Sequence, residues 1–129
     1  MGRDIKILLV EDNPEDAAFT RRLLKHNKLE GDLVVASNGL QALEALEKKA
    51  GEGDLPNLIL LDINLPDISG IDLLTQIKQD DRFRHIPVVI LTGSNEDDDI
   101  QRSYDLGAST YLVKPIFSDA LMLVIDRIF

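Results

Sequence analysis

The chain has 129 residues, 44% of them hydrophobic, which fits one globular domain with a substantial core. Its 14 basic and 23 acidic residues give a net charge of −9, which favours solubility and disfavours nucleic acid as a partner. The absence of cysteine excludes disulfides and thiolate metal sites and fits a cytoplasmic location. No apolar run approaches the ~20 residues of a membrane span, and the first residues do not form a signal peptide, so no membrane insertion is expected.

The chain begins with a strand pattern and a helix pattern. Residues 5–10 are mostly apolar and predict a strand that ends at two acids. Asn13 and Pro14 then predict a helix start, an N-cap followed by proline at the first helical position. Phe19 and Leu23 are four residues apart and predict the buried stripe of this helix.

The middle of the chain contains the most apolar segment. Residues 33–36 predict a second strand, and residues 58–61 have the uninterrupted apolar pattern of a strand buried on both faces of a parallel sheet. Asp62 ends this strand, and Pro66 prevents its continuation because proline lacks an amide hydrogen. The apolar residues at helical spacing after these two strands are Leu40, Leu43, Leu46, Ile71, Leu74 and Ile77.

The last third repeats the pattern. Residues 88–91 predict another buried strand, and the acids at 96–99 stand at the start of the next helix, where the helix dipole favours them. Gly107 is the expected residue after that helix, and a strand over residues 109–113 follows. The predicted core stripe of the last helix is Phe117, Leu121, Val124, Ile125 and Ile128.

This alternation of strands and helices predicts the fold. Parallel strands need long crossover connections, which helices usually supply. We therefore expect an α/β fold, a three-layer αβα sandwich around a five-stranded parallel sheet. No linker or repeat indicates a second unit, so residues 1–129 are expected to form a single domain.

Four of the predicted strands end in residues that carry chemistry. In a parallel sheet the carboxyl ends lie on one edge, where open α/β folds bind their ligands. Each residue alone has an ordinary structural explanation, such as a turn cap, a charge at a helix start or a solvated lysine. Their coincidence at one edge predicts a site. The residues are Glu11 with Asp12, Asp62 with Asn64, Thr92 with Ser94, and Lys114.

The predicted cluster is acidic enough to raise the pKa of one carboxyl or to recruit a cation. Two carboxylates about 5 Å apart repel by roughly 3 kcal/mol at an effective dielectric constant of about 20. Oxygen ligands without histidine or cysteine favour Mg²⁺, which also takes a phosphate oxygen. Asp62 is then a plausible nucleophile that forms an acyl phosphate, with Thr92 bonded to one phosphoryl oxygen and Lys114 paired with another.

At this point the sequence resembles a known family. Over essentially its whole length it is similar to the receiver (CheY-like) domain of two-component response regulators. Five landmarks of that family have counterparts here. They are the acid pair Glu11 and Asp12, the phosphoacceptor Asp62, the hydroxyl residue Thr92, the switch aromatic Tyr111, and Lys114 before a proline.

The resemblance implies further structural detail. The strand order would be 2-1-3-4-5, that of the flavodoxin/CheY-like fold. Mg²⁺ would be held by Asp12, Asp62 and the main-chain carbonyl of Asn64, with Glu11 acting through water. The bond before Pro115 would be cis and would direct the preceding lysine into the site.

The resemblance also implies a function. A histidine kinase or phosphotransfer protein would transfer a phosphoryl group to Asp62, and the receiver would supply the catalytic groups for its own phosphorylation and slow dephosphorylation without being an enzyme for a separate substrate. Thr92 and Tyr111 would then move and change the face formed by the fourth helix, fifth strand and fifth helix. Tyr111 could instead only pack on the last helix.

Two features bear on partners. The acidic run from Asn95 to Asp99 and the loop over residues 50–56 resemble those of single-domain regulators that pair with phytochrome-type kinases. A second copy of the chain could bind through Leu121, Val124 and Ile128, although core packing also explains most of that stripe.

Three alternative functions can be weighed. A haloacid-dehalogenase-type phosphatase needs Asp-x-Asp at its nucleophile, whereas this chain has Asp62-Ile63-Asn64. A flavodoxin-like flavin carrier is disfavoured because the acids at 11 and 12 would repel the phosphate of the flavin. A receiver-shaped module that is never phosphorylated is disfavoured because every catalytic position is filled.

Overall fold

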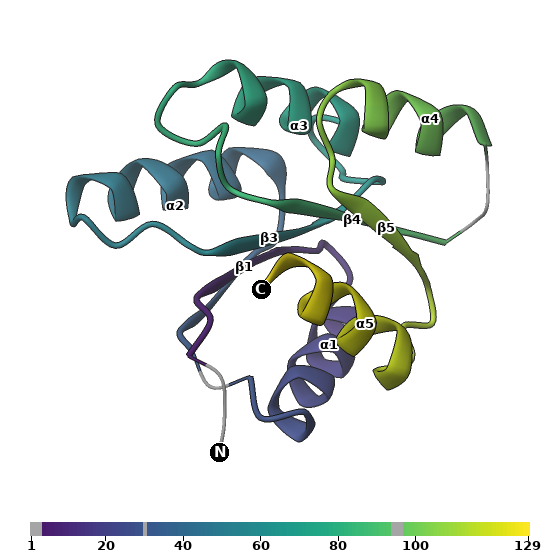
Figure 1. The fold of residues 1–129 in the computed structure, drawn as a ribbon. Coiled ribbons are helices and arrows are strands. Elements are labelled where there is room, and N and C mark those ends of the chain that lie inside the picture. Colours follow the sequence, from purple (N-terminus) through teal and green to yellow (C-terminus); the bar gives the residue numbers. More distant parts are fainter. Residues whose placement is uncertain (1–3, 30, 94–96) are drawn as a thin grey trace.

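The structure is a computed structural model that describes residues 4–29, 31–93 and 97–129 (Figure 1). Within these ranges, five parallel strands form one sheet, as the sequence pattern predicts, in the order β2-β1-β3-β4-β5, as the resemblance implies. The α/β prediction is therefore confirmed. The strands are β1 (Ile7–Val10), β2 (Leu33–Ala36), β3 (Leu58–Asp62), β4 (Val88–Thr92) and β5 (Thr110–Val113).

Helices cover both faces of the sheet. The second, third and fourth helices lie on one face and the first and fifth on the other, which gives three layers (Figure 1). Among the described residues, no helix combines the length and apolar character that crossing a membrane requires. The helices are α1 (Pro14–His26), α2 (Gly39–Gly51), α3 (Gly70–Gln79), α4 (Asp97–Asp105) and α5 (Ser118–Ile128).

The register brings the carboxyl ends of the strands level with one another. Val10 at the end of β1 is opposite Leu61 of β3, and Thr92 at the end of β4 is opposite Val113 of β5. Asp62 extends β3 by one residue beyond Leu61. Residues that follow these strands therefore share one edge of the sheet.

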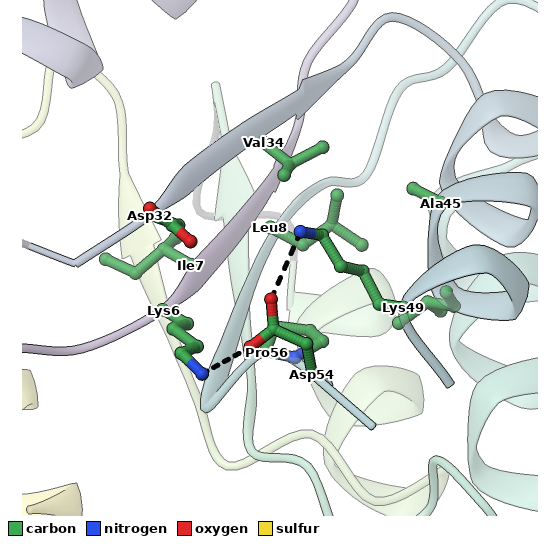
Figure 2. A pocket seen from close by; sticks show the side chains of 10 residues that line it. Lys6, Ile7, Leu8, Asp32, Val34, Ala45, Lys49, Asp54 and Pro56 are labelled. Carbon is green, nitrogen blue, oxygen red and sulfur yellow. Dashed lines mark hydrogen bonds and ion pairs between the residues drawn. The ribbon is translucent and has the colours of Figure 1, made fainter. Parts of the chain in front are cut away.

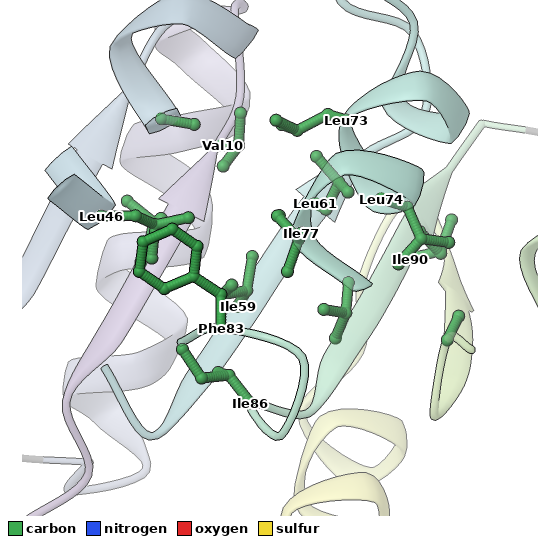
Figure 3. Close-up of a cluster of buried hydrophobic side chains, with 14 of the residues drawn as sticks. Val10, Leu46, Ile59, Leu61, Leu73, Leu74, Ile77, Phe83, Ile86 and Ile90 are labelled. Carbon is green, nitrogen blue, oxygen red and sulfur yellow. The ribbon is translucent and has the colours of Figure 1, made fainter. Parts of the chain in front are cut away.

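The core lies on both sides of the central strands. Figure 3 shows the cluster on the face that includes α3. Every residue of β3 and β4 is buried, which confirms the prediction that the segment 58–61 is enclosed on both faces. Ile71, Leu74 and Ile77 of α3 are buried against this sheet, as predicted, and Phe83 closes the same cluster. Because α3 begins directly after the loop that follows β3, this packing fixes both ends of that loop.

Three residues of the predicted apolar stripes are exposed, and Leu40 at the start of α2 is one of them, with 61% exposure. Phe19 is 42% exposed, and Thr20 and Leu24 form the buried face of α1 instead. The pair at 19 and 23 and the pair at 20 and 24 both have helical spacing, so the sequence pattern predicted the wrong face of α1 as the buried one. Phe117 is 69% exposed because it is the N-cap of α5, with an extended backbone, and lies outside the helical stripe. Leu121 of that stripe is buried, as predicted.

An ion cluster lies at the amino edge of the sheet (Figure 2). The carboxylate of Asp54 accepts a short hydrogen bond from the ammonium of Lys6 and one of 3.3 Å from Lys49. The adjoining cavity of about 20 Å³ has room for no more than a water molecule. None of the predicted site residues lines this cavity.

Candidate functional site

Lys114 lies at the centre of a group of carboxylates at the carboxyl edge of the sheet. Its backbone N–H donates to the carbonyl of Thr92 at 2.7 Å, which fixes the lysine beside the end of β4. Its ammonium donates to Asp62 Oδ2 at 3.0 Å and to Asp16 Oδ2 at 3.2 Å, and forms a short ion pair with Glu11. The bond between Lys114 and Pro115 is cis, as the resemblance implies.

Glu11 is the most enclosed member of the group, with no exposed side-chain surface. Burial raises the pKa of its carboxyl to about 7, assisted by the hydrogen bond with Asp62 and opposed by Lys114. Burial alone would lower the pKa of Lys114, but the hydrogen bonds with Glu11 and Asp62 outweigh it, so this pKa is raised. The lysine therefore stays charged among the acids.

The carboxylate of Asp62 is held on both sides. Its Oδ1 accepts from the backbone N–H of Asn64 at 2.9 Å, and its Oδ2 accepts from Lys114. The next residue, Ile63, donates its backbone N–H to Leu91 of β4 at 3.0 Å. Only 7% of the Asp62 side chain is exposed, so the chain presents a fixed, nearly enclosed carboxylate at the strand end.

The donor set fits a hard divalent cation. Carboxylate oxygens of Glu11, Asp12 and Asp62 all lie within 4.8 Å of one another. Asp12 is exposed, so the group is open on one side. Oxygen donors without nitrogen or sulfur suit Mg²⁺ or Mn²⁺, and a divalent charge would offset the repulsion that one lysine leaves uncompensated.

The other predicted residues lie at or near the same edge. Thr92 is buried at the end of β4, next to the strand that carries Asp62. Tyr111 is half-buried in β5, and its ring meets that of Tyr104 in α4 edge-on, with ring centroids 6.3 Å apart. Ser94 lies outside the described residues.

The sequence did not predict one member of the group. Asp16, in the first turn of α1, was not among the predicted site residues, yet its carboxylate accepts a hydrogen bond from the ammonium of Lys114. The available signal was position, because the first turn of a helix that starts directly after β1 lies at the carboxyl edge of the sheet. A groove lined by Asp16, Phe19 and Lys114 leads from solvent to this lysine.

Comparison with known families identifies the class of protein. A family model described as the response regulator receiver domain matches residues 7–126. The chain therefore belongs to the response regulator receiver domain family. Members of this family are signalling modules that accept a phosphoryl group, bind a divalent metal ion and interact with histidine kinases or phosphotransfer proteins.

The chain is also similar to a particular response regulator, both in sequence and in structure. Response regulator Rcp1 of Synechocystis sp. is 41% identical over 111 residues, which cover 84% of this chain and 75% of Rcp1. The crystal structure of the Mn²⁺-bound form of Rcp1 is similar with a TM-score of 0.77 and 38% identity, and the match covers 93% of this chain and 88% of that one.

Two further solved structures are similar over nearly the whole chain. The bacteriophytochrome response regulator AtBRR has a TM-score of 0.85 and 38% identity, with coverage of 98% of this chain and 93% of that one. The phosphorylated cyanobacterial phytochrome response regulator RcpA has a TM-score of 0.82 and 34% identity, with coverage of 96% and 91%.

Proposed function

We propose that this receiver accepts its phosphoryl group on Asp62. The observation that carries the proposal is the hydrogen bond of 3.0 Å from Lys114 to Asp62, in a group where two more acids share the same ammonium. An oxygen of Asp62 attacks phosphorus and forms a P–O bond, while the P–N bond of a donor phosphohistidine breaks and the imidazole leaves with the electron pair. Lys114 then pairs with the charge on the phosphoryl oxygens.

The metal ion of this site is proposed to be Mg²⁺, held by Asp12, Asp62 and the main-chain carbonyl of Asn64, with Glu11 acting through water. When bound, Mg²⁺ would neutralise charge on the carboxylates and on the incoming phosphoryl group. Within this arrangement the chain's own residues fix the nucleophile, because the backbone of Asn64 donates to the same carboxylate. The receiver supplies these groups for its own phosphorylation and slow dephosphorylation and has no separate substrate.

The response is proposed to pass from Thr92 to Tyr111. Thr92 is buried beside the site, and its partner across the sheet is Val113 of β5, two residues after Tyr111. A shallow groove on the face of α4, β5 and α5 is lined by Tyr104, Tyr111 and Leu123. A change in the rotamer of Tyr111 would alter this face. A single rotamer with and without beryllofluoride, a phosphoryl mimic, would refute the coupling.

The receiver is proposed to be cytoplasmic and its partner to be a sensor histidine kinase or a phosphotransfer protein. The similarity to AtBRR and RcpA supports the phytochrome-type kinases. Residues 1–129 would act as one receiver domain. A homodimer through the last helix would have a smaller contact surface than the sequence predicts. Leu121 is only 1% exposed and belongs to the core, so it is not available for such a contact. Val124 and Ile128 remain half-buried candidates for such a contact.

The deciding experiment uses acetyl phosphate as the donor. The protein is incubated with acetyl phosphate and Mg²⁺, and its mass is measured for the addition of one phosphoryl group. We expect addition to the wild type, none to Asp62→Asn, and none in the presence of a chelator. Uptake that survives both the substitution and the chelator would refute the site.

A further inference from the structure

An acid in the loop that follows Asp62 accepts hydrogen bonds from the start of a neighbouring helix. Asp67 lies in the loop after β3, and its two carboxylate oxygens accept the backbone N–H groups of Gly39 and Leu40, each at 2.9 Å. These are the first two residues of α2, whose N–H groups have no acceptor inside the helix. The bonds from Gly39 and Leu40 also hold the pKa of the Asp67 carboxyl below its usual range.

The loop is packed against the helix start as well as bonded to it. A Cβ atom placed on Gly39 would lie 2.3 Å from Cγ1 of Ile68 and 2.6 Å from its Cδ1. Gly39 is buried, so Ile68 directly covers the helix backbone. A larger residue at this position would force the side chain of Ile68 to move away from the helix start.

The other end of the loop reaches the phosphoacceptor. Asn64, three residues before Asp67, donates its backbone N–H to Asp62 Oδ1 at 2.9 Å. The loop is closed by the N–H of Gly70, which donates to the carbonyl of Ile63 at 2.9 Å. A movement at Asp67 would therefore be transmitted to Asn64 over a few bonds within a closed loop.

Helix capping alone does not account for Asp67. The helix α2 already has a cap in Asn38, whose Oδ1 accepts the N–H of Gln41 at 2.8 Å. Asp67 adds bonds that join the helix to a loop 27 and 28 residues further along the chain. What these bonds fix, beyond the helix, is the loop.

We propose that Asp67 is a positioning residue that anchors the loop over residues 63–70 to the start of α2 and thereby holds Asn64 against the carboxylate of Asp62. This role deepens the proposed function and rests on it for the part that concerns Mg²⁺. Because coupling between two sites is reciprocal, a ligand that fixes Asn64 also protects the bonds made by Asp67.

The test compares two variants that both weaken the start of α2. Asp67→Ala removes the bonds to the loop, and Asn38→Ala removes the helix's own cap but leaves the loop bonds. We expect Asp67→Ala to weaken Mg²⁺ binding, measured by calorimetry, by about tenfold, as is usual when a residue that orients a metal ligand is removed. Asn38→Ala should change this affinity by less than about twofold. Asp67→Asn, which keeps one acceptor oxygen, should fall between wild type and Asp67→Ala.

Amide hydrogen exchange gives a readout that does not need the metal. We expect the Asn64 amide to exchange faster in Asp67→Ala and to be unchanged in Asn38→Ala, and Mg²⁺ to slow exchange at Leu40 in the wild type. Equal effects of both variants on Asn64, or none from Asp67→Ala, would overturn the proposal. If Asp67→Ala does not fold, Asp67→Asn decides by the same measurements.

The two proposals can fail separately. A wild type that takes up no phosphoryl group, or binds no Mg²⁺, refutes the proposed function. Amide hydrogen exchange of Asn64 in Asp67→Ala still tests the anchoring role in that case. Normal phosphoryl uptake together with unchanged exchange at Asn64 in Asp67→Ala refutes the anchoring role alone.

Discussion

Two ion clusters lie at opposite edges of the sheet and differ in composition. At the amino edge one carboxylate, that of Asp54, lies between the ammonium groups of Lys6 and Lys49 (Figure 2). At the carboxyl edge one ammonium, that of Lys114, contacts three carboxylates. Each cluster joins residues that are far apart in the sequence.

The difference shows which cluster can do chemistry. The side chains of Lys6 and Asp54 are 40% and 28% exposed, and the two lysines pair with two acids, because Lys49 also lies 3.9 Å from Glu52. Glu11 and Asp62 are 0% and 7% exposed, and the acids outnumber the cation. A buried surplus of negative charge is costly unless a cation or proton joins it, which fits the divalent metal ion that receiver domains bind, whereas the first cluster is already balanced.

The largest effect is expected when the carboxyl-edge cation is removed. Lys114→Met should slow phosphoryl uptake from acetyl phosphate about 100-fold, because a charge that stabilises the transferred group is lost. It should also lower the free energy of unfolding by about 2 kcal/mol without Mg²⁺, because buried acids lose their partner. Urea unfolding and mass measurements check both. Lys49→Met is the matched control, and an equal loss of uptake in that variant would contradict the contrast between the edges.

A smaller effect, with the opposite sign, is expected when one surplus acid is neutralised. Asp12 contributes a carboxylate oxygen within 4.8 Å of those of Glu11 and Asp62. Asp12→Asn should therefore raise the free energy of unfolding without Mg²⁺ by roughly 1 kcal/mol, the repulsion expected at this separation in a solvated setting. It should also remove the stabilisation that Mg²⁺ gives the wild type. Unfolding curves with and without Mg²⁺ measure this, and a destabilised variant would argue against surplus charge.

The two edges should also respond to pH in opposite directions. The pKa of Glu11 is about 7, above its ordinary 4.5 because of burial and Asp62, so its stabilising contribution is complete below 4.5 and is lost as the pH rises through about 7. The pKa of Asp54 is lowered by its hydrogen bonds with Lys6 and Lys49, so its contribution exists above its ordinary value of 3.8 and is lost as the pH falls through the lowered pKa.

Unfolding without Mg²⁺ between about pH 5 and about pH 8 isolates the first of these groups. The wild type should lose stability across this range, and Glu11→Gln should show a flatter curve. The same slope in both proteins would mean that another group titrates.

The sequence predicted the fold because its signals were local and repeated. The segment 58–61 is apolar throughout, and Asn13 with Pro14 begins a helix through bonds to the next few residues. Once the strands are parallel, the edge shared by Asp62, Thr92 and Lys114 follows from topology. The roles of these residues stay predictions until phosphoryl uptake is measured.

What the sequence did not predict depends on side-chain direction and on contacts between distant segments. Phe19 and Leu24 both fit a helical stripe, and only packing against the sheet selects Leu24. The hydrogen bond that Asp16 accepts from Lys114 joins residues 98 positions apart. Those that Asp67 accepts from the start of α2 join residues 27 and 28 positions apart. No periodicity marks such pairs, so an acid near a helix start is explained locally until coordinates show its partner.

The smallest effect is expected from removing the acid of the amino edge. Asp54→Ala removes the acid that pairs with Lys6 and leaves Lys49 with Glu52 at 3.9 Å, but both ammonium groups reach solvent and can be hydrated, and exposed ion pairs contribute little. Phosphoryl uptake should be unchanged, and the urea midpoint should shift less than in Lys114→Met.

The same measurements made in high salt sharpen the contrast, because salt screens exposed pairs strongly and buried ones weakly. Salt should therefore reduce the difference between wild type and Asp54→Ala while leaving most of the Lys114→Met effect, and an Asp54→Ala variant that loses phosphoryl uptake would show that the two edges are coupled.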